Sequence, residues 1–427
     1  MKVLIVGGGG REHAIALKIK ENPEVTALYA APGNGGIAQI ATCLPFKATD
    51  VDGIVRWAAE NKVDFVIVAP DDPLCLGMVD ALAAQGIPAF GPRKNAAIIE
   101  GSKVFSKNLM KKYGIPTAAY ETFDDYDEAV KYLQTADMPI VVKADGLALG
   151  KGVLICPDRE SAVEAVASMM KEAKFGASGA RVVIEEFLTG PEVSVLAFTD
   201  GKTVKPMVSS MDHKRALDHD EGLNTGGMGT IAPNPCYTLE LAQRCMDEIF
   251  LPTIAAMNAE GRTFTGCLYF GLMMTPKGPK VIEYNCRFGD PETQVVLPLL
   301  KSDLLTIMRA TVDGTLADTP VEFASGAACC VVLASGGYPV SYKSGYPISG
   351  LDEAGKTATV FHAGTKLVDG QIVTAGGRVL GVTATADTLE AAIDKAYQAA
   401  DKITFTDMHM RRDIGQRALA SRKESHS

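Results

Sequence analysis

The 427-residue sequence has no long hydrophobic run and no excess of positive charge. No apolar stretch approaches the ~18 residues that a transmembrane helix needs, so we expect no membrane span. The apolar start at residues 2–6 stops at once in glycines and charged residues, which predicts a first β-strand and not a signal peptide. The net charge of 42 − 51 = −9 argues against nucleic acid or an anionic membrane as the main partner, because both select basic surfaces.

The nine cysteines include no C-x-x-C pair. Most of them stand inside apolar runs, as Cys267 and the neighbours Cys329 and Cys330 do. Buried thiols in a reducing compartment explain this pattern better than disulfides or a zinc site. We therefore expect a cytoplasmic protein.

Two common nucleotide-binding fingerprints are also missing. The tract Gly7–Gly10 follows the first apolar run, but the dinucleotide pattern would need a glycine where the chain has Glu12. The tract is either a tight strand–helix turn or a phosphate site. The stretch Gly146–Gly152 contains a lysine, but it is one residue too short for a P-loop and ends in glycine where Ser or Thr is required. We interpret it as a flexible flap whose amides close over phosphates.

Apolar runs alternate with helical patterns over the first hundred residues. Strands are predicted at Val3–Val6, Val25–Ala30 and Phe65–Ala69, and helices at Glu12–Lys20 and Leu74–Gln85. This alternation predicts a parallel, doubly wound sheet. The whole chain is too long for one core and predicts several domains.

The rest of the chain mixes strands and helices without an internal repeat, which indicates an α/β and α+β multidomain protein. We expect an N-terminal α/β domain at 1–101, a linker helix at 102–122, a small lid at 123–190, a larger strand-rich domain at 191–325 and a C-terminal α+β domain at 326–427. The segment Met211–Pro235 has neither strand nor helix pattern. Structureless loops of that length are usually functional or disordered, and the glycines and charges of this one favour function.

The sharpest local signal is the strand Val281–Asn285. Side chains alternate along a strand, so Glu283 and Asn285 project to one face. A carboxylate and an amide oxygen side by side form half of an oxygen site for Mg²⁺. The alternative is a solvated strand face, which the apolar flanks and the following Arg287–Glu292 make less suitable. On this basis Glu283→Gln should damage activity more than Asn285→Asp.

Two groups of basic residues add weaker signals. Lys143 ends an apolar strand just before the glycine flap, although a strand-end lysine in water is the commoner situation. The run Asp212–Arg215 offers three potential cations ahead of the glycine-rich Asn224–Gly229, which suggests an anion-binding lid. A surface charge run is the open alternative for the second group.

The order of these features, with a lysine before a glycine flap and a late E-x-N strand, is similar to that of the ATP-grasp ligases. In detail the chain resembles the phosphoribosylamine–glycine ligase family. The matching strings span nearly the whole sequence: GGGGREHA (7–14), APGNGG (31–36), GSKVFSK (101–107), KADGLALGKGV (143–153), EEFLTGPEVS (185–194), DHKR (212–215), NTGGMG (224–229), EYNCRFGDPE (283–292), FHAGT (361–365) and GGRVL (376–380).

The resemblance implies a monomeric enzyme that uses ATP and Mg²⁺ or Mn²⁺ to join glycine to 5-phosphoribosylamine in purine biosynthesis. It implies catalytic roles for Arg287, Lys214 and Asp212, and metal binding by Glu283 and Asn285. ATP contacts are implied for Lys103, Lys143, Gly150, Lys151, Gly152, Glu185, Glu186, Leu188 and Glu192. Substrate contacts are implied for Gly8, Gly9, Gly10, Pro70, Asp71, Asn224, Thr225, Gly226, Gly227, Gly229, Arg287 and Asp290.

One departure and two rival interpretations accompany the resemblance. The family usually has Gly-Pro-Glu where this chain has Ala69-Pro70-Asp71, so we expect the shorter Asp71 to reach the ribosyl substrate differently or through water. Related carboxylases place a second metal-binding acid on the strand before the E-x-N strand, but the predicted strand Cys267–Met274 has no acid. A non-catalytic nucleotide-binding regulator is the rival of another class, and the intact lysine, arginine and E-x-N residues argue against it.

Overall fold

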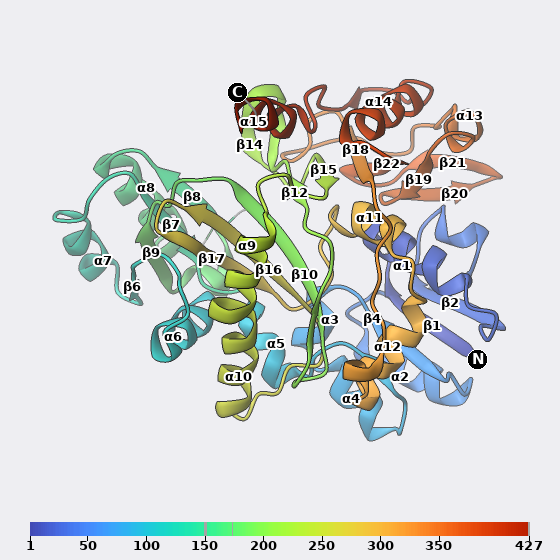
Figure 1. Ribbon diagram of the computed structural model, residues 1–427, viewed down its shortest axis with the longest axis horizontal. Helices are drawn as coiled ribbons and strands as arrows, with labels where there is room; N and C mark the ends of the chain where they lie inside the picture. Colours follow the sequence, from blue (N-terminus) through green and yellow to red (C-terminus); the bar gives the residue numbers. More distant parts are fainter. Residues whose placement is uncertain (149–151, 173, 426–427) are drawn as a thin grey trace.

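The computed structural model describes residues 1–148, 152–172 and 174–425 (Figure 1). The first hundred residues form a parallel five-stranded sheet in the order β3-β2-β1-β4-β5. Its strands are β1 (Lys2–Gly7), β2 (Ala27–Pro32), β3 (Thr42–Cys43), β4 (Phe65–Val68) and β5 (Ala89–Phe90). Its helices are α1 (Gly10–Lys20), α2 (Val51–Glu60), α3 (Asp71–Cys75), α4 (Met78–Ala84) and α5 (Lys94–Gly101). The predicted parallel, doubly wound sheet is confirmed.

One predicted helix is divided in two. The pattern over Leu74–Gln85 predicted a single helix, but α3 and α4 meet at Gly77, whose φ of 85° lies in the left-handed region. A glycine adopts that conformation without the steric penalty that a side chain would add. The chain therefore turns between the two helices, and Asp71 is placed at the start of the first one.

A small subdomain, the lid, projects from the body of the molecule at the left of Figure 1. Its antiparallel sheet has the order β6-β9-β7-β8 and carries helices α7 and α8. The elements are β6 (Tyr120–Phe123), α7 (Tyr126–Leu133), β7 (Ile140–Ala144), β8 (Val153–Cys156), α8 (Arg159–Met170) and β9 (Val182–Glu186). The apolar cluster that includes Val142, Val166 and Ile184 contains lid residues alone, so the lid has its own core.

The helix before the lid has clear start and stop signals. In α6 (Lys103–Tyr113), the Ser102 hydroxyl accepts a hydrogen bond from the Phe105 amide, and Gly114 ends the helix with φ 68°. A serine cap and a left-handed glycine are the usual terminators of an α-helix. This arrangement holds Lys103 at the first turn, between the N-terminal domain and the lid.

A second antiparallel sheet, in the order β11-β10-β16-β17, forms the middle of the molecule. Its strands are β10 (Glu192–Thr199), β11 (Val204–Pro206), β16 (Gly266–Thr275) and β17 (Gly278–Asn285). The associated helices are α9 (Leu239–Cys245), the π-helical turn η4 (Met246–Phe250), α10 (Leu251–Ala259), α11 (Thr293–Val296) and α12 (Leu304–Asp313). Val66 of β4 and Phe270 of β16 belong to one apolar cluster, so this sheet shares a core with the N-terminal domain.

A third sheet has the strand order β12-β15-β18-β22-β19, with β23 beside β18. The last quarter of the chain supplies its strands except β12 and β15, which come from the middle of the chain. These strands are β12 (Met211–Asp212), β15 (Gly229–Ala232), β18 (Ala327–Ser335), β19 (Thr359–His362), β22 (Arg378–Ala386) and β23 (Met408–His409). Two hairpins and three helices complete the unit: β13 (Arg215–Leu217) with β14 (Glu221–Asn224), β20 (Thr365–Val368) with β21 (Gln371–Thr374), α13 (Leu351–Gly355), α14 (Leu389–Ala400) and α15 (Gln416–Ser425). Short 3₁₀ turns lie at η1 (Ile37–Gln39), η2 (Gly176–Gly179), η3 (Asp218–Asp220), η5 (Leu297–Leu299) and η6 (Leu316–Asp318).

The segment Met211–Pro235 is not the structureless loop that its sequence predicted. It supplies β12 and β15 to the C-terminal sheet and forms the hairpin β13–β14. Strands of two to four residues are too short to show an alternating pattern. The proposed domain boundaries stay a prediction, and this segment pairs with strands that lie a hundred residues further along the chain.

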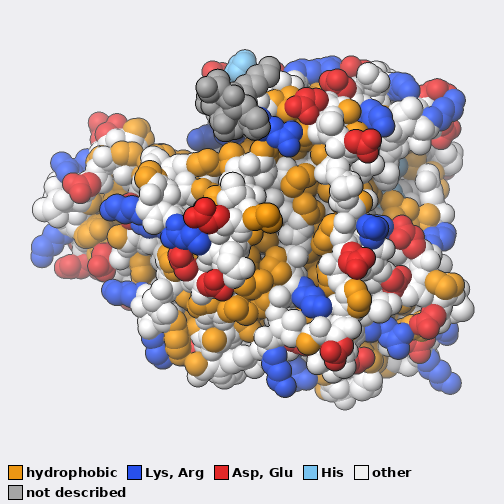
Figure 2. Space-filling model, in the orientation of Figure 1, with side chains coloured by type: hydrophobic (Ala, Val, Ile, Leu, Met, Phe, Trp, Pro, Cys, Tyr) orange, Lys and Arg blue, Asp and Glu red, His pale blue; other side chains and the backbone are white. Residues whose placement is uncertain are grey.

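The exposed surface mixes both signs of charge. Figure 2 shows Lys and Arg side chains interspersed with Asp and Glu side chains over the face in view. No helix of the described part of the chain is long and apolar enough to cross a membrane.

Candidate active site

The lid sheet and the middle sheet meet through a buried lysine. Lys143, at the end of β7, donates from Nζ to the Ile282 carbonyl of β17 at 3.3 Å. Its ammonium also pairs with Glu185 of β9, and Glu185 pairs with Lys107 of α6 at 2.6 Å. Burial opposes ionisation of Glu185, but Lys143 and Lys107 outweigh burial and hold its pKa below the usual range. A carboxylate between two lysines thus joins α6, β7 and β9.

Lys103 contacts the first residue of the glycine-rich stretch 146–152. Its Nζ donates to the carbonyl of Gly146 at 2.8 Å, and Gly146 has a left-handed φ of 87°. Gly152 is buried, and a Cβ there would lie 2.6 Å from the Cβ of Ala148, so the close approach requires glycine. The predicted ATP contacts Gly150 and Lys151 lie outside the described residues.

Lys214 lies between two carboxylates of the middle sheet. Its Nζ is 3.7 Å from Glu192 of β10 and 3.6 Å from Glu283 of β17. Burial would raise the pKa of Glu283, but Lys214, Lys143 and Lys103 in that order outweigh it and lower the pKa. Three lysines from separate segments therefore surround Glu283, which is the electrostatic setting that a polyphosphate requires.

Glu283 and Asn285 share the face of β17 that looks toward these lysines. Tyr284, between them, points into the core, where its hydroxyl bonds Thr253 at 2.8 Å. The Asn285 amide nitrogen donates to Glu100 at 3.1 Å, and the amide oxygen has no hydrogen-bond partner among the described residues. No group of three or more His, Cys, Asp or Glu side chains in the described residues is arranged to hold a metal ion. One carboxylate and one amide oxygen suit a hard cation whose other ligands come from phosphates and water.

The guanidinium of Arg287 lies just beyond this pair. Its Nη2 donates to Glu100 at 2.9 Å and its Nη1 to the Phe288 carbonyl at 3.3 Å. Glu100 and Asp71 raise the pKa of Arg287 against the effect of burial, so the side chain is a permanent cation. Its Nε is buried and has no hydrogen-bond partner among the described residues. Such an unmet donor is unusual in a folded protein and indicates a place for a ligand.

The loop after Arg287 connects the N-terminal glycine tract to the C-terminal sheet. Asp290 accepts from Gln294 at 2.8 Å and from the Arg11 amide at 3.3 Å. Arg378 of β22 donates to the carbonyls of Asp290 and Gly226, each at 2.8 Å. Burial notwithstanding, Arg378 and Arg11 keep the pKa of Asp290 low. One arginine therefore holds two of the predicted substrate loops together.

Several hydrogen bonds hold the glycine-rich loop at 224–229 in place. Thr225 donates from Oγ1 to the Lys214 carbonyl at 2.7 Å and accepts from the Gly227 amide at 3.0 Å. The Gly226 amide donates to the Tyr338 hydroxyl at 3.0 Å. A Cβ on Gly227 would lie 2.6 Å from the Asp212 carboxylate, so the loop passes directly over Asp212. Asn224 and Gly229 lie at the two ends of the loop, on β14 and β15.

The run Asp212–Arg215 does not present to the site the three cations that the sequence suggested. Burial and the carboxylate of Glu292 raise the pKa of Asp212 well above its usual range. His213 is buried, accepts from the Gly415 amide at 3.1 Å, and its pKa is lowered to about 4 by burial and by Arg411. His213 is therefore neutral at pH 7. Arg215 donates a hydrogen bond to the Gly222 carbonyl within its own hairpin. Only Lys214 of the three expected cations therefore faces the site.

The N-terminal glycines are fixed by close packing. A Cβ on Gly8 would lie 2.4 Å from the Gly33 carbonyl, and one on Gly10 would lie 2.4 Å from Gln294. The Gly9 amide donates to the Glu12 carboxylate at 2.8 Å, so that amide is already engaged. The turn interpretation accounts for these contacts, and phosphate binding by Gly8, Gly9 and Gly10 stays a prediction.

The residues expected to line the adenine pocket include more exposed side chains than the lysine cluster does. Glu186 is exposed, accepts from the Ala119 amide at 3.1 Å and lies 3.7 Å from Lys280. Leu188 is half-buried just after β9. Pro70 precedes α3, and Asp71 begins it close enough to Arg287 to influence its pKa. The contacts above thus link most of the candidate residues in the described part of the chain to one region between the lid, the middle sheet and the two outer units.

Sequence reasoning missed two residues of this region. Glu100 and Arg378 each touch several predicted site residues, but neither lies in a pattern that reports chemistry by itself. Glu100 ends a helix with buried apolar neighbours, and Arg378 begins a strand. Their partners are more than eighty residues away in the sequence, so contacts and not local motifs identify them.

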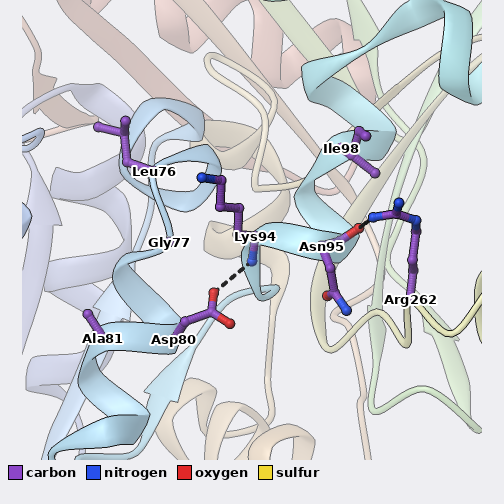
Figure 3. A pocket seen from close by; sticks show the side chains of 8 residues that line it. All are labelled: Leu76, Gly77, Asp80, Ala81, Lys94, Asn95, Ile98 and Arg262. Carbon is purple, nitrogen blue, oxygen red and sulfur yellow. Dashed lines mark hydrogen bonds between the residues drawn. The ribbon is translucent and has the colours of Figure 1, made fainter.

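A separate hollow of about 790 Å³ lies outside this region (Figure 3). Its polar groups already bond one another: Asp80 accepts from the Lys94 amide at 2.8 Å, and Arg262 donates to the Asn95 carbonyl at 2.8 Å. None of the predicted site residues lines it, so it is not the candidate site. The hollow is lined by Leu76, Gly77, Asp80, Ala81, Lys94, Asn95, Ile98 and Arg262.

Two facing antiparallel sheets, a glycine flap and a lysine-ringed E-x-N strand define an ATP-grasp enzyme. Comparison with known families places the chain further. The phosphoribosylglycinamide synthetase N domain matches residues 1–100, its ATP-grasp (A) domain matches 101–293 and its C domain matches 328–417. The chain belongs to the phosphoribosylglycinamide synthetase family, and ATP and a divalent metal are characteristic of that family.

Individual relatives are similar to this chain over nearly its full length. A phosphoribosylamine–glycine ligase of Halalkalibacterium halodurans is 49% identical over 425 residues, covering 100% of this chain and 99% of the relative. The crystal structure of the Thermotoga maritima phosphoribosylamine–glycine ligase is 35% identical with a TM-score of 0.85, covering 97% of this chain and 100% of that one. A biotin carboxylase domain of Hydrogenobacter thermophilus is 18% identical with a TM-score of 0.72, covering 96% of this chain and 91% of that one, and it shares the fold alone.

Proposed function

We propose that the chain ligates glycine to 5-phosphoribosylamine with ATP, giving glycinamide ribonucleotide, ADP and phosphate in the second step of purine biosynthesis. The observation that carries the proposal is the full-length match to ligases of that name, which includes all three domains of the family. The clustered lysines, carboxylates and arginine support it, because phosphoryl transfer mainly needs positioning and neutralised charge.

The chemistry requires two displacements. A carboxylate is a poor electrophile, so an oxygen of glycine attacks the γ-phosphorus of ATP and ADP leaves, which gives glycyl phosphate. The amine of phosphoribosylamine then attacks the carbonyl carbon and phosphate leaves with the oxygen that glycine supplied. The nitrogen loses a proton as the amide forms. Neither step needs a protein nucleophile.

In this proposal the nucleotide lies between the lid and the middle sheet. Lys103 and Lys143 contact its phosphates, Glu185, Glu186 and Leu188 line the adenine pocket, and Glu192 holds the ribose. Glu283 and Asn285 hold Mg²⁺ or Mn²⁺, which when bound neutralises phosphate charge. Closure of the lid over the flap would exclude water from the acyl phosphate.

The acceptor side of the site lies toward the N- and C-terminal units. Arg287 steadies the transferring phosphoryl group, and its unmet buried Nε supports that role. Asp212, beneath the loop at 224–229, and Lys214, 3.6 Å from Glu283, are assigned to the acceptor side of the reaction. Pro70, Asp71, Asp290 and the loop at 224–229 would surround phosphoribosylamine and glycine.

A carboxylase is the second candidate because the biotin carboxylase fold is so similar. Against it, β16 carries no acid opposite the E-x-N strand; Asn285 pairs with Tyr269 and Glu283 with Gly271. The ligase proposal is tested by measuring ADP from ATP and Mg²⁺ with glycine and phosphoribosylamine, each omitted in turn. ADP formation should require both substrates. ADP formed with bicarbonate and neither substrate would overturn the proposal.

A further inference from the structure

Glu100 is a buried carboxylate that accepts hydrogen bonds from the last residue of β17 and from the two residues that follow it. It lies near the end of α5, and only 8% of the residue is exposed. Its Oε1 accepts from the Asn285 amide nitrogen at 3.1 Å and from Arg287 Nη2 at 2.9 Å. Its Oε2 accepts from the Cys286 backbone amide at 2.7 Å. One side chain of the N-terminal unit thus reaches both the expected metal ligand and the expected catalytic arginine.

The contact with Asn285 decides which atom of the amide faces the metal position. The oxygen and nitrogen of an amide are nearly alike in shape, so the hydrogen-bond partner determines the orientation. Both oxygens of Glu100 accept from N–H donors, and the amide nitrogen of Asn285 is the atom turned toward Glu100. The oxygen is then left for the face that Asn285 shares with Glu283.

The contact with Arg287 fixes a guanidinium in the same way. One edge of the guanidinium is held by Glu100 and by the Phe288 carbonyl, while Nε stays buried without a partner among the described residues. Arg287 also pairs with Glu100 as an opposite charge, with Nη2 2.9 Å from Oε1. The two groups therefore keep each other aligned.

We propose that Glu100 is a positioning residue that turns the oxygen of Asn285 toward the metal and aligns Arg287 with the transferring phosphoryl group. The inference rests on the proposed function. Among the described residues Glu100 accepts hydrogen bonds from Asn285, Cys286 and Arg287, so its effect on the metal and the phosphoryl group would pass through these residues. Groups that orient metal ligands in this way typically change metal affinity by 10- to 100-fold when replaced.

The test compares Glu100→Gln and Glu100→Asp with Glu260→Gln as a matched control. Glu260 also joins two elements, accepting from Lys112 and from Tyr113 at 2.6 Å each, but it lies at the end of α10 away from the site strand. Mn²⁺ affinity is measured by the electron paramagnetic resonance of free Mn²⁺ in the presence of a non-hydrolysable ATP analogue. The Mg²⁺ concentration for half-maximal turnover and the KM for glycine are measured in parallel.

We expect Glu100→Gln to weaken Mn²⁺ binding about tenfold, to raise the half-maximal Mg²⁺ concentration similarly and to change the KM for glycine little. Glu100→Asp should fall between it and the wild type, and Glu260→Gln should match the wild type. Wild-type Mn²⁺ affinity in a folded Glu100→Gln variant would overturn the inference. Unfolding of both Glu100 variants would also overturn it, because the residue would then serve the fold. A wild type without ligase turnover would refute the proposed function, while the Mn²⁺ affinities would still decide the role of Glu100.

Discussion

At the scale of single residues, Glu283 has the most demanding environment in the site. It lies 3.6 Å from Lys214 and within the electrostatic reach of Lys143 and Lys103, which together lower its pKa against burial. A negative group among three cations balances their charge until phosphates enter. A carboxylate in this place serves the ligands of the site more than the apolar core.

Replacing Glu283 with Gln should therefore impair activity much more than stability. The shape is kept, but the charge that offsets the metal is lost, and we expect turnover to fall roughly 100-fold at limiting Mg²⁺ with partial rescue at high Mg²⁺. Turnover over a range of Mg²⁺ concentrations, with thermal unfolding alongside, checks this. Wild-type turnover at limiting Mg²⁺ would show that β17 is not the metal site.

Replacing Asn285 with Asp should be harsher than the sequence suggested. From the sequence alone the new carboxylate could still bind the ion, so the change was expected to be the milder of the two. In the structure the amide nitrogen donates to Glu100, and an aspartate would set its carboxylate directly against the buried carboxylate of Glu100. Loss of a donor to a buried acceptor costs about 1–3 kcal/mol of unfolding free energy, measurable by urea denaturation. Asn108→Asp, at an exposed residue whose oxygen accepts from Tyr120, should cost little.

The sequence indicated Glu283, Asn285 and Lys143 because local patterns carry their chemistry, and the family resemblance added Arg287. It could not indicate Glu100, because that role depends on a contact 185 residues away in the chain. It also gave His213 a charge, although burial in the fold keeps the imidazole neutral at pH 7. Burial and long-range partners are properties of the folded chain, and local residue types do not reveal them.

At the scale of elements, β9 joins the lid to the helix beneath it. Glu185 of β9 pairs with Lys107 of α6 and Lys143 of β7, and all three side chains are less than a tenth exposed. Removing one partner of a buried ion pair leaves an uncompensated charge, which is far costlier than losing a surface pair. The strength of the lid sheet therefore depends on this carboxylate.

Replacing Glu185 with Gln should lower the unfolding free energy by about 3 kcal/mol, because two buried ammonium groups lose their counter-charge. Urea denaturation followed by fluorescence or circular dichroism measures the change. The control is Glu353→Gln, whose pair with Lys356 at 2.5 Å is more than 60% exposed and should contribute less than about 0.5 kcal/mol. Equal stability of the two variants would contradict the structural role of the Glu185 cluster.

Element prediction succeeded where patterns were long and regular. The predicted strands of the N-terminal sheet match β1, β2 and β4, and the long β16 and β17 follow apolar runs that the sequence shows directly. The two-residue strands β3 and β5 were not predicted. The strands within Met211–Pro235 were not predicted, because they are short and because β15 pairs with β18, which lies far along the chain. The break at Gly77 was not predicted, because a helical periodicity continues through it. The turn shows in the left-handed backbone conformation of Gly77.

At the scale of the whole molecule, the N-terminal and C-terminal units meet at a pair of buried histidines. The His362 backbone amide donates to His13 Nδ1 at 2.8 Å, and the two rings lie edge to face at 5.5 Å. Asn34 adds a bond to the His362 carbonyl at 2.8 Å and also contacts the glycine tract. The interface therefore requires a neutral His13, because a protonated Nδ1 could not accept.

Acid should loosen this interface. Burial and His362 lower the pKa of His13 to about 3, and burial lowers that of His362 to about 4. Because the folded-state pKa lies below the unfolded value of 6.5, the unfolded chain binds the extra proton. The stabilisation is complete above about pH 6.5 and declines as the pH falls toward 3. His13 alone should cost about 1.4 kcal/mol between pH 7.5 and pH 5.5.

The variant His13→Asn isolates this contribution. Its amide oxygen can still accept from His362, but it takes up no proton, so its unfolding free energy should depend less on pH by about 1.4 kcal/mol over that range. Urea denaturation at pH 7.5 and pH 5.5 gives the comparison. His219→Asn, at an exposed turn residue, should keep the wild-type dependence. A His13→Asn variant with the wild-type loss on acidification would contradict the account.

The central claim is that glycine is activated as an acyl phosphate within the site between the lid and the middle sheet. The most direct measurement starts from glycine labelled with ¹⁸O in both carboxylate oxygens, together with ATP, Mg²⁺ and phosphoribosylamine. If the carboxylate attacks the γ-phosphorus, one labelled oxygen must leave with phosphate when the amine displaces it. The account predicts phosphate with one ¹⁸O atom, seen by mass spectrometry, in equal amount to the amide formed. Unlabelled phosphate accompanying amide formation would contradict it.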